Sequence, residues 1–386
     1  MILIPCVVPL DELVYYIITV KGIIIYMKIL IVSTGIQDRT GTYVVLKNII
    51  PFLMKNNEVT ILTNQGDVDI ECDKLVQLTT NRIFPQYYFM SGLSKLLRDG
   101  FFNDFDIIHA FDYPIYPTDF LTLKKSQISA PLLISVHGSI HQFSSFPLNY
   151  LKKIHNNFML RYKNRVSKFI ASTLAEKKHL VEYGIDESKI EILPLGVKPL
   201  KLDLTKRSGK NITYIGRLSK TKNVELLVKA FAKLHNSDAS LIIAGPDYGS
   251  LQMLKNLVQE LHIENRVIFR GWITEEEKTE LLSKTSIFVH PSLEDVFSLS
   301  LAETSASGVP VVAFDVEANP EIIIDMVTGK IVKEKNSDSL RETMDYILNN
   351  QKLINQFSEN GHVLTSKKYN WSQTVSILQN LYSSLI

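Results

Sequence analysis

The chain of 386 residues is 45% hydrophobic and 21% charged, and its 42 Lys and Arg residues nearly balance its 40 Asp and Glu residues. This length exceeds what one hydrophobic core usually supports, so it predicts two domains, and the composition excludes an intrinsically disordered chain. Only Cys6 and Cys72 occur, without metal or redox spacing, which excludes a disulfide framework and favours a reducing compartment. A net charge of +2 gives no indication of a nucleic-acid partner.

Residues 1–26 precede the first segment that is typical of a folded domain. Asp11 and Glu12 interrupt them early and no small-residue cleavage site follows, so a signal peptide is a poor fit. Residues 28–32, directly after Met27, have the composition of a first strand in an α/β protein. We therefore expect Met27 to be the true start and residues 1–26 to be a mis-assigned or accessory leader. No apolar run in the sequence reaches the ~18 residues of a membrane span.

The first domain opens with a strand–helix–strand unit. Strands are expected at residues 28–32 and 58–63, and the helix between them at residues 43–54 follows a polar loop that contains Gly41. This loop lacks a complete G-x-G-x-x-G, which disfavours a dinucleotide site and a dehydrogenase. Gly41 would let a ligand approach the start of the helix closely, although a plain turn glycine explains the local sequence equally well.

Two later strands end in histidine. Residues 106–109 end at His109, and residues 132–138 contain His137 near their end. A lone histidine is more often a hydrogen-bonded structural group than a catalytic one. Two histidines at strand ends of one parallel sheet favour a ligand site, because ligands bind at the carboxyl edge of such sheets. Further strands at residues 166–171 and 189–193 flank a helix at residues 175–183.

The stretch from residue 120 to residue 175 contains no Asp or Glu. Its eight cations are Lys124, Lys125, Lys152, Lys153, Arg161, Lys163, Arg165 and Lys168. A solvated basic face would explain this block, and so would an anionic partner such as a membrane surface or a phosphorylated ligand. Aromatic and apolar residues are interleaved with the cations, as in segments that lie at membrane interfaces, so we favour a membrane-facing patch.

A second α/β unit follows a polar, basic linker at residues 199–210. Its expected strands and helices alternate: strands at 211–216, 240–245 and 266–271, and helices at 224–234, 251–261 and 274–282. The loop after the first of these strands carries Arg217 and Lys222, five positions apart. A guanidinium fork and a point charge so arranged would suit a diphosphate, although a basic surface loop is the simpler interpretation of the loop taken alone.

Residues 286–314 form the most informative stretch. Short apolar runs at residues 286–289 and 309–314 predict buried strands, and residues 297–307 predict a helix that ends at Gly308. Glu303 is the only charged residue between Asp295 and Asp315. A buried carboxylate needs a partner, so Glu303 either pairs with a nearby Lys or Arg or belongs to a ligand site. The remaining expected elements are a segment at 320–325, a strand at 329–333, and helices at 337–348, 352–359 and 372–386.

From Met27 to Ile386 these motifs resemble, in order, those of glycosyltransferase family 4, whose members have the GT-B fold. Residues 214–222 look like the family's donor-diphosphate loop, with Arg217 and Lys222 in its two cation positions. Residues 241–249 look like its nucleotide-side loop. Asp295 and Glu303, eight positions apart, are similar to its paired acids, and His137 with Gly138 is similar to the histidine–glycine pair that faces the transferred sugar.

The resemblance implies a set of site residues. Catalytic roles fall to His137, Arg217, Lys222 and Asp295. The donor-binding residues are Gly41, Gly216, Gly245, Asp247, Glu294, Val296, Phe297, Ser298, Leu299 and Glu303. By the same resemblance Asp295 would hold the sugar hydroxyls and Glu303 the ribose hydroxyls. The sequence departs from the family pattern at Asp295, where glutamate is usual and Glu294 stands one position early, and at Asn223, where glycine is common and backbone strain is expected.

The resemblance also implies two Rossmann-like domains facing across a cleft, with a C-terminal helix crossing back to the first domain. Residues 27–198 with 371–386 would form the acceptor-side domain, and residues 199–370 the nucleotide-sugar domain. The expected enzyme is a retaining hexosyltransferase without a metal or cofactor, which uses a UDP- or GDP-linked sugar. Its expected acceptor is a glycan or lipid-linked glycan of a surface polysaccharide, handled in the cytoplasm at the inner membrane face. A GT-B sugar-nucleotide epimerase and a non-enzymatic sugar-nucleotide binding subunit are the alternatives.

Overall fold

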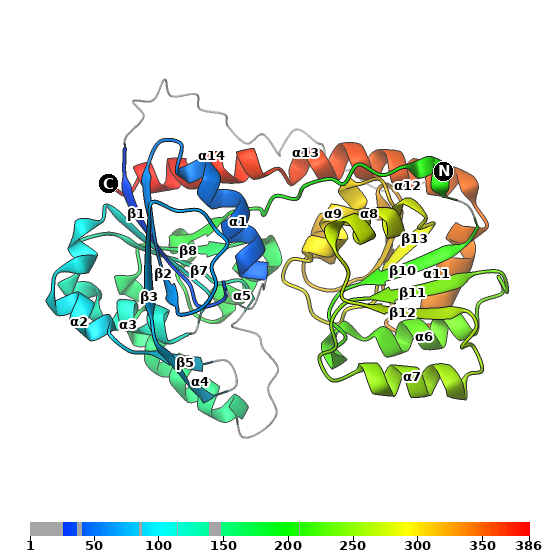
Figure 1. Cartoon of the computed structure of the whole chain (residues 1–386), viewed down its shortest axis with the longest axis horizontal. Coiled ribbons are helices and arrows are strands. Elements are labelled where there is room, and N and C mark those ends of the chain that lie inside the picture. Colours follow the sequence, from blue (N-terminus) through cyan, green and yellow to red (C-terminus); the bar gives the residue numbers. More distant parts are fainter. Residues whose placement is uncertain (1–25, 37–40, 85–86, 114, 139–147, 208) are drawn as a thin grey trace, which may run out of the picture.

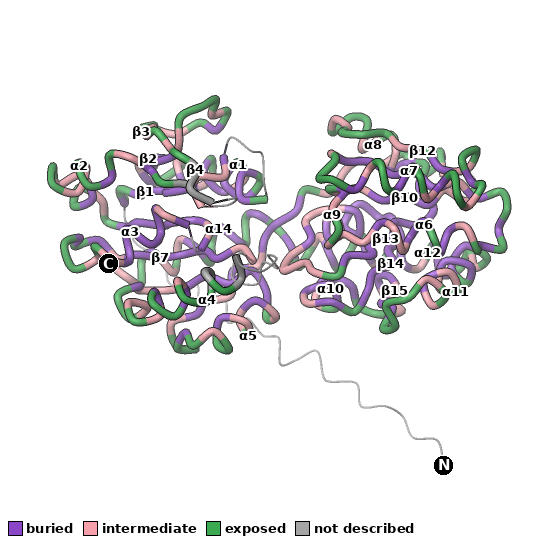
Figure 2. The backbone as a smooth tube through the Cα atoms, turned by 90° about the horizontal axis from the view of Figure 1, so that it is seen from below, coloured by how far each residue is buried: buried purple, intermediate pink, exposed green. Residues whose placement is uncertain are grey.

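The computed structural model describes residues 26–36, 41–84, 87–113, 115–138, 148–207 and 209–386. All of the expected leader except Tyr26 lies outside these residues. The described chain forms two α/β halves that lie side by side along the long axis of the molecule (Figure 1). Buried residues follow the strands of both halves in Figure 2, as expected for parallel sheets that are covered on both faces.

The first half is built on a seven-stranded parallel sheet with the order β3-β2-β1-β6-β7-β8-β9. Its strands are β1 Lys28–Val32, β2 Glu58–Asn64, β3 Lys74–Leu78, β6 Ile107–Phe111, β7 Leu132–Ser135, β8 Lys168–Ala171 and β9 Ile190–Ile192. Its helices are α1 Gly41–Leu53, α2 Leu93–Arg98, α3 Tyr116–Lys124, α4 Leu148–Met159 and α5 Leu174–Glu182. An antiparallel hairpin, β4 Thr80–Phe84 and β5 Tyr87–Met90, stands apart from the sheet.

The second half is built on a six-stranded parallel sheet with the order β12-β11-β10-β13-β14-β15. Its strands are β10 Asn211–Ile215, β11 Ser240–Ala244, β12 Val267–Gly271, β13 Ile287–His290, β14 Val311–Phe314 and β15 Gly329–Val332. Its helices are α6 Val224–Ala232, α7 Leu251–Glu260, α8 Glu275–Ser283, α9 Leu299–Ala306, α10 Asn319–Ile322, α11 Ser337–Leu348 and α12 Gln351–Asn360. Both sheets therefore present their loops and helix starts at a carboxyl edge, where such folds bind ligands.

The C-terminal helix returns to the first half. After α12, a π-helical turn at Gly361–Thr365 and α13 Ser366–Lys368 lead to α14 Trp371–Ser383, which packs against α1 (Figure 1). Tyr382 of α14 is fully buried, and its hydroxyl lies 2.6 Å from Nδ1 of His109 on β6. Nε2 of His109 lies 2.8 Å from Oγ of Ser135. His109 is therefore a satisfied structural group that anchors α14, and the expected crossing helix is confirmed.

The two chain segments that pass between the halves are bonded to each other. The amide of Val197 donates to the carbonyl oxygen of Tyr369 at 3.0 Å, and the Thr374 hydroxyl donates to the carbonyl oxygen of Pro194 at 2.7 Å. A Cβ atom on Gly196 would come within 2.4 Å of the backbone nitrogen of Trp371. Glycine at position 196 is what allows the two segments to approach this closely.

Two predicted boundaries near the site differ from the structure by two residues. The helix expected at residues 297–307 begins at Leu299, because Ser298 has extended backbone and accepts the Leu301 amide as the N-cap. The strand expected to end at His137 ends at Ser135, because His137 and Gly138 have φ angles of 50° and 77°, which a strand does not allow. The other predicted strands and helices agree with the structure to within two residues at each end, except that the C-terminal helix expected at residues 372–386 ends at Ser383. Within the described part of the chain, no helix has both the length and the apolar character to cross a membrane.

Candidate functional site

The carboxyl edges of the two sheets meet around Val296, in the loop between β13 and α9. The carbonyl oxygen of Val296 accepts the Thr173 hydroxyl from the first half at 3.2 Å. Beside it, the carboxylate of Glu321 on α10 accepts the amides of Leu174 and Ala175, at 2.9 and 2.8 Å. These two amides begin α5, so an acid of the second half caps a helix of the first.

Lys222 and Asp295 are brought together at the centre of this edge. Nζ of Lys222 lies 2.5 Å from Oδ2 of Asp295, and Nε2 of His290 lies 2.8 Å from the same oxygen. Burial acts to raise the pKa of Asp295, but the Lys222 ammonium and the His290 ring hold it well below its usual range. Asp295 is therefore a carboxylate with a fixed orientation, supported by two neighbours of which the sequence indicated only Lys222.

The Lys222 loop is positioned by strained and close-packed backbone. Asn223, which follows Lys222, has a φ angle of 53°, so the strain expected from its replacement of glycine is present. A Cβ on Gly245 would come within 1.9 Å of the carbonyl oxygen of Gly216, and the backbone of Gly245 has a φ angle of 134°. Gly216 and Gly245 thus let the two loops that carry Lys222 and Asp247 run against each other.

Arg217 and Asp247 lie in these loops but have different surroundings and structural roles. The Arg217 guanidinium is exposed and lies 5.3 Å from the ring centre of Tyr248. Oδ1 of Asp247 accepts the amides of Gly249, Ser250 and Leu251, at 2.8 to 3.1 Å, and these bonds hold the pKa of Asp247 below its usual range. Asp247 therefore orders the start of α7, whereas Arg217 faces solvent.

The start of α9 supplies amide groups beside Asp295. Helix geometry leaves the amides of the first turn without carbonyl partners inside the helix, and the Ser298 side chain accepts that of Leu301 at 3.3 Å. Phe297 and Leu299 pack against the hydrophobic cores of both halves, and the Phe297 ring meets that of Tyr369 edge-on at 5.3 Å. This packing fixes the direction in which the first-turn amides point.

Glu303 has the partner that a buried carboxylate requires. Its Oε2 lies 2.7 Å from Nζ of Lys278 on α8, and both side chains are largely buried. Burial raises the pKa of Glu303, and the Lys278 ammonium opposes this effect. Of the two interpretations of Glu303, the ion pair with a nearby lysine is the one that the structure shows. If Glu303 also binds the donor ribose, it does so while paired with Lys278.

His137 and Gly138 face the second half from the end of β7. Burial lowers the pKa of His137 to about 4, so its ring is neutral at pH 7. The amide of Gly138 donates to Oε1 of Glu176 at 2.6 Å, and the amide of Ser172 donates to Oε2 at 2.6 Å. Glu176 is buried, and burial raises its pKa to about 7. Sequence reasoning missed Glu176, although a Glu in the first turn of a helix at the sheet edge is a usable signal.

Two further acids at this edge were also missed. Asp112 follows β6 with a φ angle of 67°, accepts the Thr42 hydroxyl at 2.7 Å, and has a pKa that burial raises to about 6. This contact lies beside Gly41, where a Cβ would meet nothing within 4 Å, so local packing does not require glycine there. Glu317, with a φ angle of 42°, accepts the amide of Asp295 at 3.0 Å.

Glu294 lies between charges of both signs. Burial and Glu317 raise its pKa, and the Lys222 ammonium opposes them.

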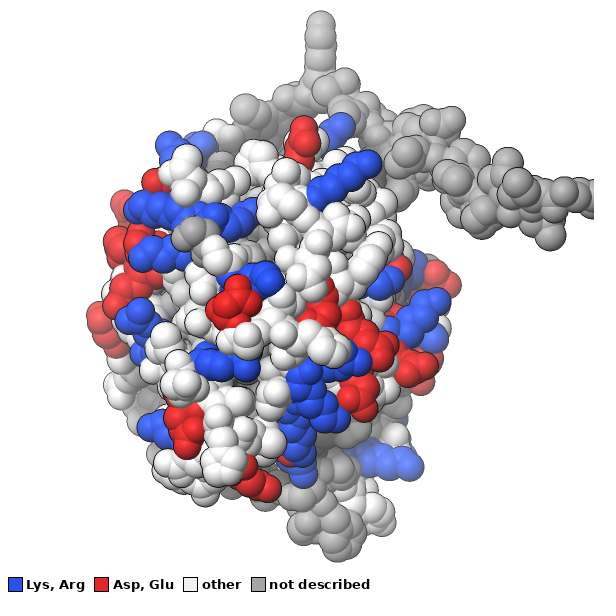
Figure 3. Space-filling view, turned by 90° about the vertical axis from the view of Figure 1, so that its right-hand side faces the viewer, with Lys and Arg blue, Asp and Glu red and all other residues white. Residues whose placement is uncertain are grey.

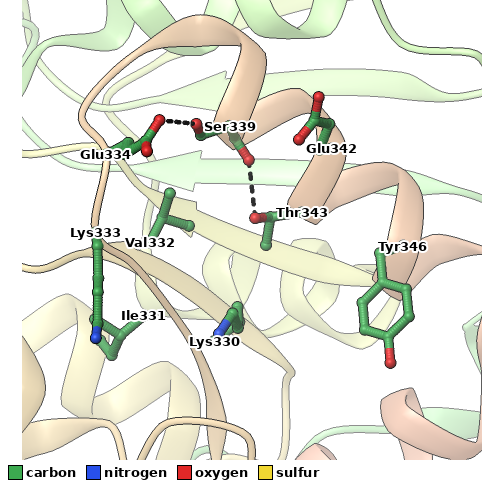
Figure 4. A pocket seen from close by; sticks show the side chains of 9 residues that line it. All are labelled: Lys330, Ile331, Val332, Lys333, Glu334, Ser339, Glu342, Thr343 and Tyr346. Atoms are coloured by element: carbon green, nitrogen blue, oxygen red, sulfur yellow. Dashed lines mark hydrogen bonds between the residues drawn. The ribbon is translucent and has the colours of Figure 1, made fainter.

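Among the described residues, no group of three or more His, Cys, Asp or Glu side chains is arranged to hold a metal ion. A surface hollow between β15 and α11 is lined by other residues, among them Glu334, Ser339 and Thr343 (Figure 4). None of the predicted site residues lines that hollow.

Two family profiles match the chain, one for each half. The profile described as Glycosyltransferase Family 4 matches residues 40–199, and the one described as Glycosyl transferases group 1 matches residues 203–363. The chain belongs to glycosyltransferase family 4. It is 26% identical to an uncharacterized glycosyltransferase of Methanocaldococcus jannaschii over 300 aligned residues. The aligned stretch covers 72% of this chain and 75% of that protein.

Another relative aligns over a shorter stretch. The D-inositol 3-phosphate glycosyltransferase of Nocardia farcinica is 27% identical over 244 residues, which is 57% of this chain and 53% of that protein. Among solved structures, Anabaena HepE in complex with UDP and glucose superposes with a TM-score of 0.75 at 16% identity, over 93% of this chain and all of that one. The sucrose-phosphate synthase of Thermosynechococcus elongatus superposes with a TM-score of 0.74 at 19% identity, over 93% of this chain and 98% of that one. These likenesses show that the family 4 chain has the GT-B fold.

Proposed function

We propose that this glycosyltransferase is a retaining hexosyltransferase that uses a UDP- or GDP-linked sugar. The observation that carries the proposal is the Lys222–Asp295 pair, which joins a cation suited to a diphosphate to an acid suited to sugar hydroxyls. Solved structures of Anabaena HepE contain UDP and UDP-glucose, and this chain shares their fold, which supports a nucleoside diphosphate sugar as the donor.

In the proposed reaction the bond between the anomeric carbon and the diphosphate oxygen breaks, and a bond to an acceptor hydroxyl oxygen forms on the same face of the sugar. The acceptor proton passes to the departing diphosphate. Negative charge develops on that diphosphate, so fixed cations and amides directed at it lower the barrier. Lys222, Arg217 and the first-turn amides of α9 would supply them without a metal ion. His137, neutral at pH 7, would hydrogen-bond a hydroxyl of the transferred sugar.

The proposed acceptor is a hydroxyl of a glycan or lipid-linked glycan in the synthesis of a surface polysaccharide, at the inner face of the cytoplasmic membrane. One relative supports this assignment: a 41.2 kDa protein in the cps region of Klebsiella pneumoniae, which is 26% identical over 226 residues.

The test measures release of nucleoside diphosphate from UDP- and GDP-sugars, with and without a membrane extract as the source of acceptor. Release that requires the extract, with the anomeric configuration retained in the product, is the expected result. Conversion of the donor to another sugar nucleotide without extract would identify an epimerase. Donor binding without any turnover would identify a binding subunit, and either result would overturn the proposal.

A further inference from the structure

Helix α4 exposes three large apolar side chains to solvent. The residues Tyr150, Ile154 and Phe158 are 62%, 51% and 44% exposed, and their spacing of four places them on one face of the helix. The opposite face carries polar groups: Asn156 is buried, and Nε2 of His155 lies 2.7 Å from Oδ2 of the buried Asp119. Met159 on this inward face is also buried, in the core of the first half, so α4 contributes one apolar side chain to the core and leaves three others exposed to solvent.

Exposed cations lie on α4 and in the turn that follows it. Lys153 lies three positions after Tyr150 on the outward side of α4, and Arg161 lies in the 3-10 helix Leu160–Arg165 directly after α4. Among the described residues neither cation has an acidic partner within ion-pair distance, whereas Lys168 of the same basic block pairs with Glu191 at 2.6 Å. The nearby Lys163 is also occupied, because it donates to the carbonyl oxygen of Gly184. The block at residues 120–175 thus resolves into cations that support the fold and cations that face outward.

Aromatic contacts continue this surface beyond the end of α4. The ring of Tyr162 meets that of Phe158 edge-on at 5.4 Å, and the guanidinium of Arg165 lies 4.7 Å from the ring centre of Tyr162. On the end face of the second half, by contrast, basic and acidic side chains are interspersed (Figure 3). Ion pairs such as Lys233–Asp338, at 2.9 Å, are typical of that half.

We propose that the outward face of α4, formed by Tyr150, Ile154 and Phe158 with Lys153, binds the surface of an anionic lipid bilayer together with Arg161 of the following turn. Apolar side chains that enter the headgroup region while neighbouring cations meet anionic lipids are what such a surface requires. A helix of 12 residues is too short to span a bilayer, so α4 would lie in the plane of the membrane. A second copy fits less well, because a twofold contact through this face would set its cations against their own counterparts.

The inference goes beyond the proposed function, because it needs neither donor nor acceptor. The test is sedimentation of the full chain with vesicles of equal parts phosphatidylcholine and phosphatidylglycerol, and with vesicles of phosphatidylcholine alone, at low and high salt. Binding only to the anionic vesicles, and loss of that binding at high salt, are expected. Lys153→Gln with Arg161→Gln should weaken binding about 30-fold, since each cation near an anionic surface contributes about fivefold. Ile154→Ser with Phe158→Ser should weaken it at least about tenfold.

The matched controls lie on the second half. Met253→Ser with Lys255→Gln changes an exposed apolar residue and a cation on α7, and it should leave binding unchanged. All variants change exposed side chains, so thermal unfolding should match the parent chain. The proposal is overturned if the parent chain does not bind anionic vesicles, or if the α4 and α7 variants lose binding equally. It is also overturned if the chain dimerises without lipid and the α4 variants abolish the dimer. Failure of the glycosyl transfer assay would leave these readouts unaffected.

Discussion

Nζ of Lys222 and Oδ2 of Asp295 lie 2.5 Å apart, so the cation assigned to the diphosphate and the acid assigned to the sugar form one ion pair. A donor diphosphate that enters beside Lys222 must compete with Asp295 for the same ammonium group. His290 then becomes important, because its ring would keep one hydrogen bond to Asp295 when Lys222 turns to the donor. The pair holds both side chains in orientations close to those that the proposed reaction uses.

Lys222→Ala should lower kcat/KM by about 10²–10³, which corresponds to about 2.7–4 kcal/mol of lost transition-state stabilisation. Lys220→Ala is the matched control, because Lys220 is an exposed lysine on the same short helical turn. Steady-state assays with the preferred sugar nucleotide measure both variants, and thermal unfolding verifies that each is folded. Near-normal turnover of Lys222→Ala would remove Lys222 from the diphosphate site.

Gly138→Ala should impair turnover by pushing the two halves apart. A Cβ at this position would come within 2.4 Å of Cγ2 of Val296, and the backbone φ of 77° adds strain of about 1 kcal/mol. Val296→Ala removes the nearest methyl group, so the double variant should recover part of the lost kcat/KM. A double-mutant cycle measures this coupling. Purely additive losses would show that contact across the two halves is not the cause.

Glu176→Gln should destabilise the fold by about 1–3 kcal/mol, because an amide side chain cannot accept from both Gly138 and Ser172 and leaves a buried donor unpaired. The effect should also depend on pH. The pKa of Glu176 is raised from 4.5 to about 7, so the folded protein holds a proton that the unfolded chain has lost between these values. This group's contribution to stability is therefore full below pH 4.5 and falls as the pH rises towards 7.

Urea unfolding of the parent chain and of Glu176→Gln between pH 4.5 and pH 7 measures this dependence. The parent chain should lose more stability than the variant as the pH rises. Glu187→Gln changes an exposed acid that pairs with Lys177, and it is the control that should leave the dependence unchanged. Equal slopes for the parent chain and Glu176→Gln would mean that the carboxyl does not titrate in this range.

His109 should give the opposite pH dependence. Burial lowers its pKa from 6.5 to about 3, so the unfolded chain binds a proton that the folded protein excludes. Its contribution to stability is present above pH 6.5 and is lost as the pH falls towards 3. In His109→Asn, stability should fall less between pH 6.5 and pH 4 than in the parent chain. His262→Asn, at an exposed position with a φ of 54° that asparagine tolerates, should behave like the parent.

The alternation of strands and helices in both halves could be predicted because buried parallel strands are short apolar runs. The edge strand β3 Lys74–Leu78 could not, because polar residues interrupt its apolar ones and its assignment depends on pairing with β2. Helix α4 escaped prediction for a related reason, since Tyr150, Ile154 and Phe158 are exposed and polar Asn156 is buried, so burial does not follow the polarity of the sequence.

The residues of the candidate site also fall into those that the sequence could predict and those that it could not. Lys222 and Asp295 could be proposed from their motifs, which fix residue type and spacing. Glu317 could not, because its role depends on an amide that lies 22 residues away in the chain. Glu176 carried a signal in the first turn of a helix, but its contact with the Gly138 amide, 38 residues away, depends on the fold. The sequence around Glu303 left open whether a cation or a ligand would be its partner, and only the packing of α8 against α9 brings Lys278 to it.

The crossing of α14 has a consequence for the order in which the protein is made. Trp371, Leu378 and Tyr382 belong to the core of the first half, yet every element of the second half precedes them in the chain. On the ribosome the first half is therefore synthesised first, but its core is completed last. Part of that core stays exposed until α14 has been synthesised. A chain that stopped before residue 371 would carry a finished second half beside an unfinished first half.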